Sequence, residues 1–191
     1  MKACEVSRKT RETDVFVRFD PSGGGVSVST GIGFFDHMLT AFGVHGGFGL
    51  TVKAKGDLQV DGHHTVEDVG LVLGSALGQA LGGKEGLARY GHALIPMDEA
   101  LALAVVDLSG RPYLKLDAPM PQQQIGAYDS CLTAEFLRAF AMNSGITLHV
   151  RTLSGENAHH MTEAIFKALA HALQDAMAPV GGGVLSSKGV L

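Results

Sequence analysis

One chemical motif occurs twice in the chain, and this duplication limits the folds that the chain can adopt. His63-His64-x-x-Glu67 in the first half returns as His159-His160-x-x-Glu163 in the second half. Upstream of the motifs, His37 and Glu135 lie in similar apolar stretches, separated by nearly the same number of residues as the two motifs. Such self-similarity at a long period is typical of a duplicated structural unit.

Each half is predicted to contain strands, then a helix, a further strand and a final helix. Stretches with apolar residues at helical spacing alternate with short runs rich in β-branched residues. This pattern predicts an α+β fold of two units related by a pseudo-twofold axis, each a small sheet with helices on one face. The predicted strands are Val15–Phe19, Val26–Ser29, Leu50–Ala54, Leu101–Asp107, Tyr113–Leu116 and Thr147–Thr152, and the predicted helices are Phe34–Phe42, Thr65–Leu81, Cys131–Met142 and Met161–Met177.

The chain of 191 residues is expected to form one domain. Its two repeats are expected to span about residues 5–85 and about residues 92–178, followed by a C-terminal tail over residues 179–191. Two adjacent glycines, Gly82 and Gly83, end the first long helix, and the run from Gly181 to Gly183 indicates a hinge before the tail.

The spacing of histidine and glutamate within each motif suits metal binding. Residues four apart share one face of a helix, so His63 and Glu67 can hold one ion, and His159 and Glu163 a second. Imidazole and carboxylate ligands without thiolate suit Mn, Fe or Zn, and octahedral nitrogen–oxygen sites favour Mn or Fe. The sequence therefore predicts two sites for divalent metal ions.

The second histidine of each motif is expected to serve the opposite repeat. His64 and His160 are each turned by about 100° from the preceding histidine, which directs them away from the ion of their own motif. Under a pseudo-twofold axis, His64 would reach the ion of the second motif, and His160 the ion of the first. His37 and Glu135 would each add one further ligand. The histidines without a counterpart in the other repeat are not assigned to the metals: His45, His92, His149 and His171.

Composition narrows the possible partners of the protein. The net charge is −4 and the Lys and Arg residues are scattered, which speaks against a nucleic-acid partner or an anionic membrane surface. The longest apolar run, over residues 69–81, is too short to span a bilayer. Charged residues make up only 18% and glycines number 26, which suggests surface buried between subunits. Two cysteines and no signal peptide predict a reducing, cytoplasmic location.

Isolated basic residues could hold a phosphate group on a small ligand. Arg111 lies in a Ser-Gly-Arg-Pro turn, where its guanidinium can bind phosphate oxygens bidentately. Arg89, Lys167 and the tail from Ser186 to Lys188 offer similar chemistry, although the residues alone favour ordinary surface charges. Neither a Walker loop nor a dinucleotide fingerprint is present, so no nucleotide site is predicted.

Several short segments of the sequence resemble segments that occur in the same order in one known family. They are Thr30–Leu39, Asp61–Asp68, Arg89–Gly91, Pro96–Ala100, Ser109–Tyr113, Asn157–Ala164 and Ser187–Gly189. So many ordered segments are highly specific, and they cover nearly the whole chain. Through them the chain resembles the imidazoleglycerol-phosphate dehydratases of histidine biosynthesis.

The resemblance implies a metal-dependent hydro-lyase that converts imidazole glycerol phosphate to imidazole acetol phosphate and water. It also implies a duplicated βββαβα unit, two Mn²⁺ ions and a twenty-four-subunit shell with active sites at subunit interfaces. Matched positions assign the metal ligands to His37, His63, His64, Glu67, Glu135, His159, His160 and Glu163. They assign the substrate phosphate, partly from a neighbouring chain, to Arg89, Arg111, Lys167, Ser186 and Lys188. The catalytic set is then Glu12, as the acid or base, with His63, Glu67, His159 and Glu163.

Two departures from the family and two rival functions stay open at this point. Glu135 stands where some members carry histidine, and the glycine-rich stretch before the tail leaves Ser186 and Ser187 as alternatives. A dinuclear hydrolase would use the same ligands to form a metal-bound hydroxide and would release phosphate from esters. A metal-storage shell would bind many ions per chain and would not need an ordered set of phosphate ligands.

Overall fold

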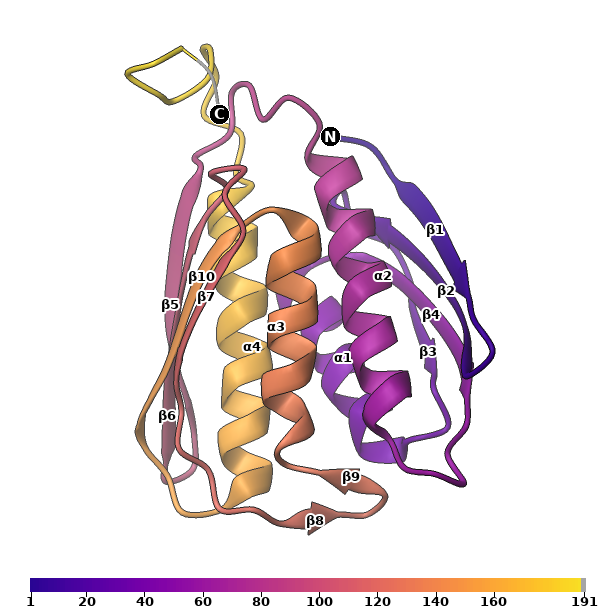
Figure 1. The fold of residues 1–191 in the computed structure, drawn as a ribbon. Helices are drawn as coiled ribbons and strands as arrows, with labels where there is room; N and C mark the ends of the chain where they lie inside the picture. The colour runs from indigo at the N-terminus through magenta and orange to yellow at the C-terminus, as the bar shows by residue number, and fades with distance from the viewer. Residues whose placement is uncertain (190–191) are drawn as a thin grey trace.

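The computed structural model describes residues 1–189, and in it two four-stranded sheets enclose four helices (Figure 1). The last two residues of the predicted tail therefore lie outside the described residues. The first half contains β1 (Cys4–Lys9), β2 (Thr13–Asp20), β3 (Val26–Ser29), α1 (Gly33–Gly46), β4 (Gly49–Gly56) and α2 (His63–Leu81). The second half contains β5 (Tyr90–Met97), β6 (Ala100–Asp107), β7 (Tyr113–Asp117), α3 (Leu132–Ser144), β10 (Thr147–Ser154) and α4 (Ala158–Ala176).

The two sheets have the same topology, which confirms the predicted duplication. Their strand orders are β1-β2-β4-β3 and β5-β6-β10-β7. In each sheet one pair is parallel, β3 with β4 and β7 with β10, and the other pairs are antiparallel. The predicted α+β class is correct, and each half has the βββαβα order that the resemblance implied.

Two strands and one hairpin were missed by the sequence prediction. β1 lies at a sheet edge and exposes most of its side chains, and charged side chains are common on such edges because they prevent pairing with other chains. β5 buries only small residues, Gly91 and Ala93, so its alternation is weak. The second half also carries an insertion, the short hairpin β8 (Gln124–Ile125) and β9 (Tyr128–Asp129), which has no counterpart in the first half.

The helices pair across the two halves rather than within them. α2 packs mainly on α3, and α1 packs mainly on α4. Buried aromatic rings fill the space between the helices, with Phe35 against Phe136 at 5.5 Å and Phe136 against Phe166 at 5.0 Å between ring centroids. This crossed pairing brings α1 of the first half beside the His159-His160-x-x-Glu163 motif of the second half.

The start of α2 is anchored to the first sheet by a buried carboxylate. Asp68, next to Glu67, accepts hydrogen bonds from the Arg8 guanidinium and the Thr13 hydroxyl. Because two donors satisfy this carboxylate, the first turns of α2 are held in a fixed position on β1 and β2. Among residues 1–189, no helix is long and apolar enough to cross a bilayer.

Candidate metal centre

Three predicted ligands from the two halves meet at one point. The Nε2 atom of His37 on α1 lies 3.5 Å from a carboxylate oxygen of Glu163 on α4, and Nε2 of His159 lies 3.3 Å from the same oxygen. One potential ligand atom from each residue lies within 4.8 Å of the others. Two imidazole nitrogens and a carboxylate oxygen form a donor set that fits a divalent ion such as Mn, Fe or Zn.

Local packing explains how α4 presents these groups. Asn157 caps the helix, and its side-chain oxygen accepts the backbone N–H groups of His159 at 2.9 Å and His160 at 3.4 Å. The ring of Phe34 packs edge-on against the His159 imidazole, with 4.8 Å between centroids. The cap and the aromatic contact therefore restrict the orientation of the first turn, where the motif histidines lie.

The carboxylate of Glu163 is nearly enclosed, with only 9% of its side chain exposed. Burial works against its ionised form, but the Lys167 ammonium at 2.6 Å and the nearby His37 outweigh burial and lower the pKa of Glu163 below its ordinary value. Lys167 contacts one oxygen of Glu163, and the histidines face the other. In this chain, Lys167 lies beside His37, His159 and Glu163, which form the candidate metal group, and not with the other predicted phosphate ligands.

The corresponding residues of the first motif are more open. Nε2 of His63 lies 3.9 Å from the Glu67 carboxylate, and both side chains are more than 40% exposed. Glu135, the repeat equivalent of His37, pairs instead with Arg138 at 3.2 Å. Within residues 1–189 the compact three-residue group occurs once, at Glu163. His63 also lines a cavity of about 380 Å³ between the start of α2 and the β8–β9 hairpin.

The crossed role predicted for His64 and His160 does not occur within one chain. Nδ1 of His64 lies 3.0 Å from Asp57 and 4.0 Å from Glu12, all in the first half. Nδ1 of His160 lies 2.7 Å from Glu99 in its own half. These histidines point away from their own motif, as the helix geometry requires, but loops of the same repeat lie in their path. It is His37 that reaches the other half.

Two carboxylates beside these histidines were not identified as site residues from the sequence. The hydrogen bond from His160, followed by those from the backbone N–H groups of Asn157 and Glu156, lowers the pKa of Glu99 to about 2. In turn, the hydrogen bond to Glu99 raises the pKa of His160, and that to Asp57 raises the pKa of His64. The sequence repeat could have identified Glu99 as a site residue, because Glu99 aligns with the predicted catalytic residue Glu12.

Most predicted phosphate ligands gather at the end of the second half that lies away from His159 and Glu163. Arg89 binds both oxygens of Asp107, through Nε at 2.7 Å and Nη2 at 3.2 Å, and Arg111 approaches the same carboxylate at 3.5 Å. Nη1 of Arg89 also donates to the backbone carbonyl of Leu185 in the tail, at 2.6 Å. This contact brings the segment with Ser186 and Lys188 close to the arginines. The Ser186 hydroxyl accepts the Lys188 backbone N–H at 3.2 Å.

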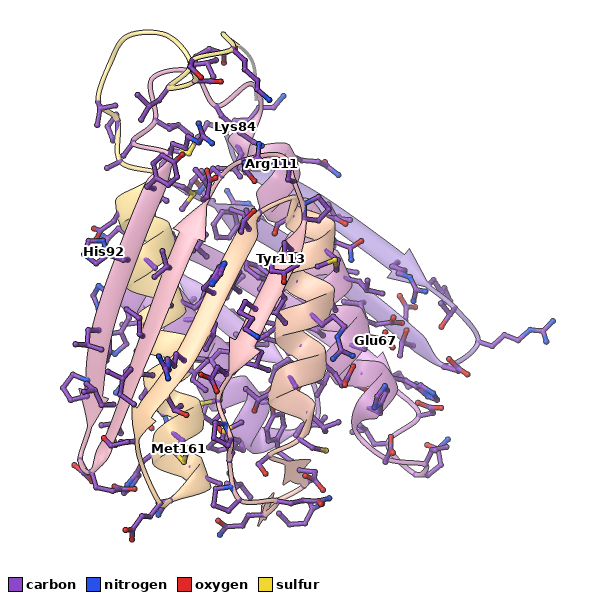
Figure 2. The ribbon with its side chains drawn as sticks, turned by 60° about the vertical axis from the view of Figure 1, so that its left-hand side comes forward. Glu67, Lys84, His92, Arg111, Tyr113 and Met161 are labelled. Atoms are coloured by element: carbon purple, nitrogen blue, oxygen red, sulfur yellow. The ribbon has the colours of Figure 1, made fainter. Side chains whose placement is uncertain are left out.

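A helix length separates the arginines from the metal group. The backbone N–H of Arg89 donates to the carbonyl of Ala176 at the end of α4, whereas His159 lies in its first turn. At 1.5 Å per residue, the two ends are about 25 Å apart. Figure 2 shows the same separation, with Arg111 at one end of the molecule and Met161, close to His159 in sequence, near the other.

Comparisons with known proteins agree with this architecture. Residues 30–173 match the family model described as imidazoleglycerol-phosphate dehydratase. The imidazoleglycerol-phosphate dehydratase of Acetivibrio thermocellus is 56% identical, covering 98% of this chain and 97% of the relative, and that of Desulforamulus reducens is 53% identical, covering 100% and 98%. A Staphylococcus aureus crystal structure of this enzyme superposes with a TM-score of 0.85 at 38% identity, covering 93% of this chain and 99% of the other. A crystal structure of IGPD from Pyrococcus furiosus superposes with a TM-score of 0.85 at 39% sequence identity, covering 97% of this chain and 100% of the other.

The family model and the full-length relatives agree with the ordered segments and with the duplicated fold. On these grounds the chain belongs to the imidazoleglycerol-phosphate dehydratase family of hydro-lyases.

Proposed function

We propose that this protein removes water from imidazole glycerol phosphate to give imidazole acetol phosphate in histidine biosynthesis, with two divalent ions, preferably Mn²⁺. Family membership supports the substrate and the reaction class. The observation that carries the metal dependence is the convergence of His37, His159 and Glu163. This donor set contains no thiolate and suits a hard or borderline ion.

One ion would be held by His37, His159 and Glu163, and the other by the repeat-equivalent residues Glu135, His63 and Glu67. His64 and His160 would complete the two sets. When bound, the ions would supply Lewis-acid stabilisation of negative charge on the substrate imidazole. Such stabilisation is needed because the C–H bond that breaks lies beside an imidazole and not beside a carbonyl group.

The proton is carried by Glu12 in this proposal. Its side chain is 57% exposed, and its carboxylate lies 4.0 Å from His64, so it is available to a ligand bound beside the motif. The guanidinium groups of Arg89 and Arg111, the Lys188 ammonium and the Ser186 hydroxyl would bind the phosphate. Lys167 would act on the substrate only if its contact with Glu163 rearranged, because both groups are joined at 2.6 Å.

The site is shared between copies of the chain. The arginines and the metal group lie about 25 Å apart along α4, farther than a small phosphate ester and an arginine side chain can span together. Residues from neighbouring copies would therefore complete the site, which supports a homo-oligomer. Its form, a twenty-four-subunit shell, is taken from the resemblance alone. Nucleic acids and membranes are not partners in this proposal, and the location is the cytoplasm.

The experiment is metal removal and restoration with two readouts on one sample. Protein stripped with a chelator should be inactive, and Mn²⁺ should restore conversion of imidazole glycerol phosphate with about two ions bound per chain. Release of inorganic phosphate would instead indicate a hydrolase, and binding of many more ions without turnover would indicate a storage protein. Binding of two ions without either product would refute the assigned substrate and leave the metal centre standing.

A matched variant separates proton transfer from metal binding. Glu12→Gln keeps the shape of the side chain but removes its basicity, so turnover should fall by about 100- to 10,000-fold. The amount of bound metal should stay the same. Unchanged turnover would remove Glu12 from the mechanism.

A further inference from the structure

Equivalent glutamates of the two repeats have different surroundings. Glu12 lies directly before β2 and Glu99 directly before β6, so each stands beside the second histidine of its motif. The Glu12 carboxylate lies 4.0 Å from Nδ1 of His64, beyond hydrogen-bond distance. The Glu99 carboxylate lies 2.7 Å from Nδ1 of His160, at normal hydrogen-bond distance. Therefore only Glu99, the glutamate of the second half, makes a hydrogen bond to its histidine.

The Glu99 carboxylate is fixed on both oxygens. Its Oε1 atom accepts the backbone N–H groups of Glu156 at 3.1 Å and Asn157 at 2.8 Å, in the loop that leads into α4. Its Oε2 atom faces the His160 ring. An ionised carboxylate has no proton to donate, so Nδ1 of His160 must carry the proton of this hydrogen bond. The lone pair of neutral His160 is then on Nε2, which lies 3.6 Å from the Asp98 carboxylate.

In the first half, Asp57 has the same role from a different position. It follows β4, only 16% of its side chain is exposed, and its two oxygens lie 3.0 and 3.2 Å from Nδ1 of His64. His64 is thereby held in the same tautomer as His160. Because Asp57 occupies Nδ1 of His64, the equivalent glutamate of this half, Glu12, is left exposed and free.

We propose that Glu99 and Asp57 are positioning residues that hold His160 and His64 with the proton on Nδ1, so that each presents Nε2 to a divalent ion. This inference rests on the proposed metal dependence and deepens it. Metal-binding histidines commonly donate their other ring N–H to a carboxylate, and loss of that partner typically weakens metal affinity by about 10- to 100-fold. The repeat has thus diverged, with one glutamate positioning a ligand and the other available to the substrate.

Glu99→Gln tests the proposal because the orientation of the new amide is determined by its neighbours. The backbone N–H groups of Glu156 and Asn157 require an acceptor, so the amide oxygen must face them. The amide NH₂ group then faces Nδ1 of His160 and can only donate, which moves the ring proton to Nε2. A protonated Nε2 cannot bind a metal, so this nearly isosteric change removes one ligand.

The measurement is Mn²⁺ affinity of the assembled, substrate-free protein by competition with a chelating dye. Glu99→Gln should bind the weaker of its Mn²⁺ ions about 10- to 100-fold less tightly than the unmodified protein. The melting temperature of the metal-free protein should be unchanged, and saturating Mn²⁺ should restore kcat. Glu12→Gln makes the same chemical change at the equivalent position and should leave Mn²⁺ affinity unchanged while lowering turnover.

The outcomes separate this inference from the proposed function. Tight Mn²⁺ binding by the unmodified protein and equal binding by Glu99→Gln would overturn the positioning role and leave the metal dependence standing. No Mn²⁺ binding by the unmodified protein would overturn both. If Glu99→Gln does not assemble, Asp57→Ala decides, because it removes the acceptor of His64 in an independent loop. Weaker binding by Asp57→Ala supports the proposal, and unchanged binding overturns it.

Discussion

The close contact between α2 and α3 gives a quantitative prediction from two glycines on one helix. A Cβ atom added at Gly74 would lie 2.5 Å from the carbonyl oxygen of Phe140 and 3.1 Å from the Ser144 backbone nitrogen. A Cβ atom added at Gly78 would lie 3.3 Å from its nearest neighbour, the Ser144 carbonyl oxygen. The substitutions Gly74→Ala and Gly78→Ala are therefore the same chemical change at positions with different space.

The expected magnitudes follow from two opposing terms. Replacing glycine by alanine inside a helix stabilises it by about 1 kcal/mol. At Gly74 the methyl group falls about 0.9 Å short of ordinary contact with a backbone oxygen that cannot rotate away, and such overpacking costs about 1–3 kcal/mol. At Gly78 the strain is small, so the helix term prevails. We expect Gly74→Ala to be about 2 kcal/mol less stable than Gly78→Ala.

Thermal unfolding of the metal-free variants measures this difference. For a chain of this size, about 2 kcal/mol corresponds to roughly 4–8 °C in Tm. Scans at one heating rate and one protein concentration keep the comparison fair if unfolding is irreversible. The reasoning is refuted if Gly74→Ala melts at or above the temperature of Gly78→Ala. Because α2 carries His63 and Glu67 and α3 carries Glu135, the less stable variant should also bind metal more weakly.

Three further predictions concern a thiol, a phosphate ligand and the inserted hairpin. Although Cys131 is exposed, partial desolvation, followed by the neighbouring Asp129, raises the pKa of its thiol to about 11. Its alkylation rate, measured by mass spectrometry, should therefore keep rising between pH 9 and 10, and a plateau by pH 9 would contradict this. Arg111→Gln should lower kcat/KM by about 10- to 100-fold if the guanidinium binds phosphate. The control Arg151→Gln breaks only a surface ion pair and should leave kcat/KM unchanged. Tyr128→Phe removes the hydroxyl that lies 3.0 Å from the buried Thr133 hydroxyl. The free energy of unfolding, measured with denaturant, should fall by about 1–3 kcal/mol. An unchanged free energy would show that another group satisfies the Thr133 hydroxyl.

The elements that were predicted and those that were missed differ in a physical way. The helix that carries Glu67 was predicted over Thr65–Leu81 because its apolar residues recur at helical spacing, and its glycines did not obscure that period. The structure begins this helix two residues earlier, at His63. The edge strands β1 and β5 were missed because a strand that buries few large side chains has little alternation to detect. The β8–β9 hairpin has strands of two residues each, too short for any period.

The sequence by itself determined the duplication, the α+β class, the family and the histidines and glutamates of the two motifs, because repeats, periodicity and motifs are local properties of a chain. Only the tertiary structure decided which of these side chains meet. The packing of α1 on α4 brings His37 to Glu163, and the loops around Asp57 and Glu99 hold His64 and His160 within their own halves. The length of α4 likewise separates the arginines from the metal group. Such pairings depend on side-chain packing between segments far apart in sequence, which no local pattern contains.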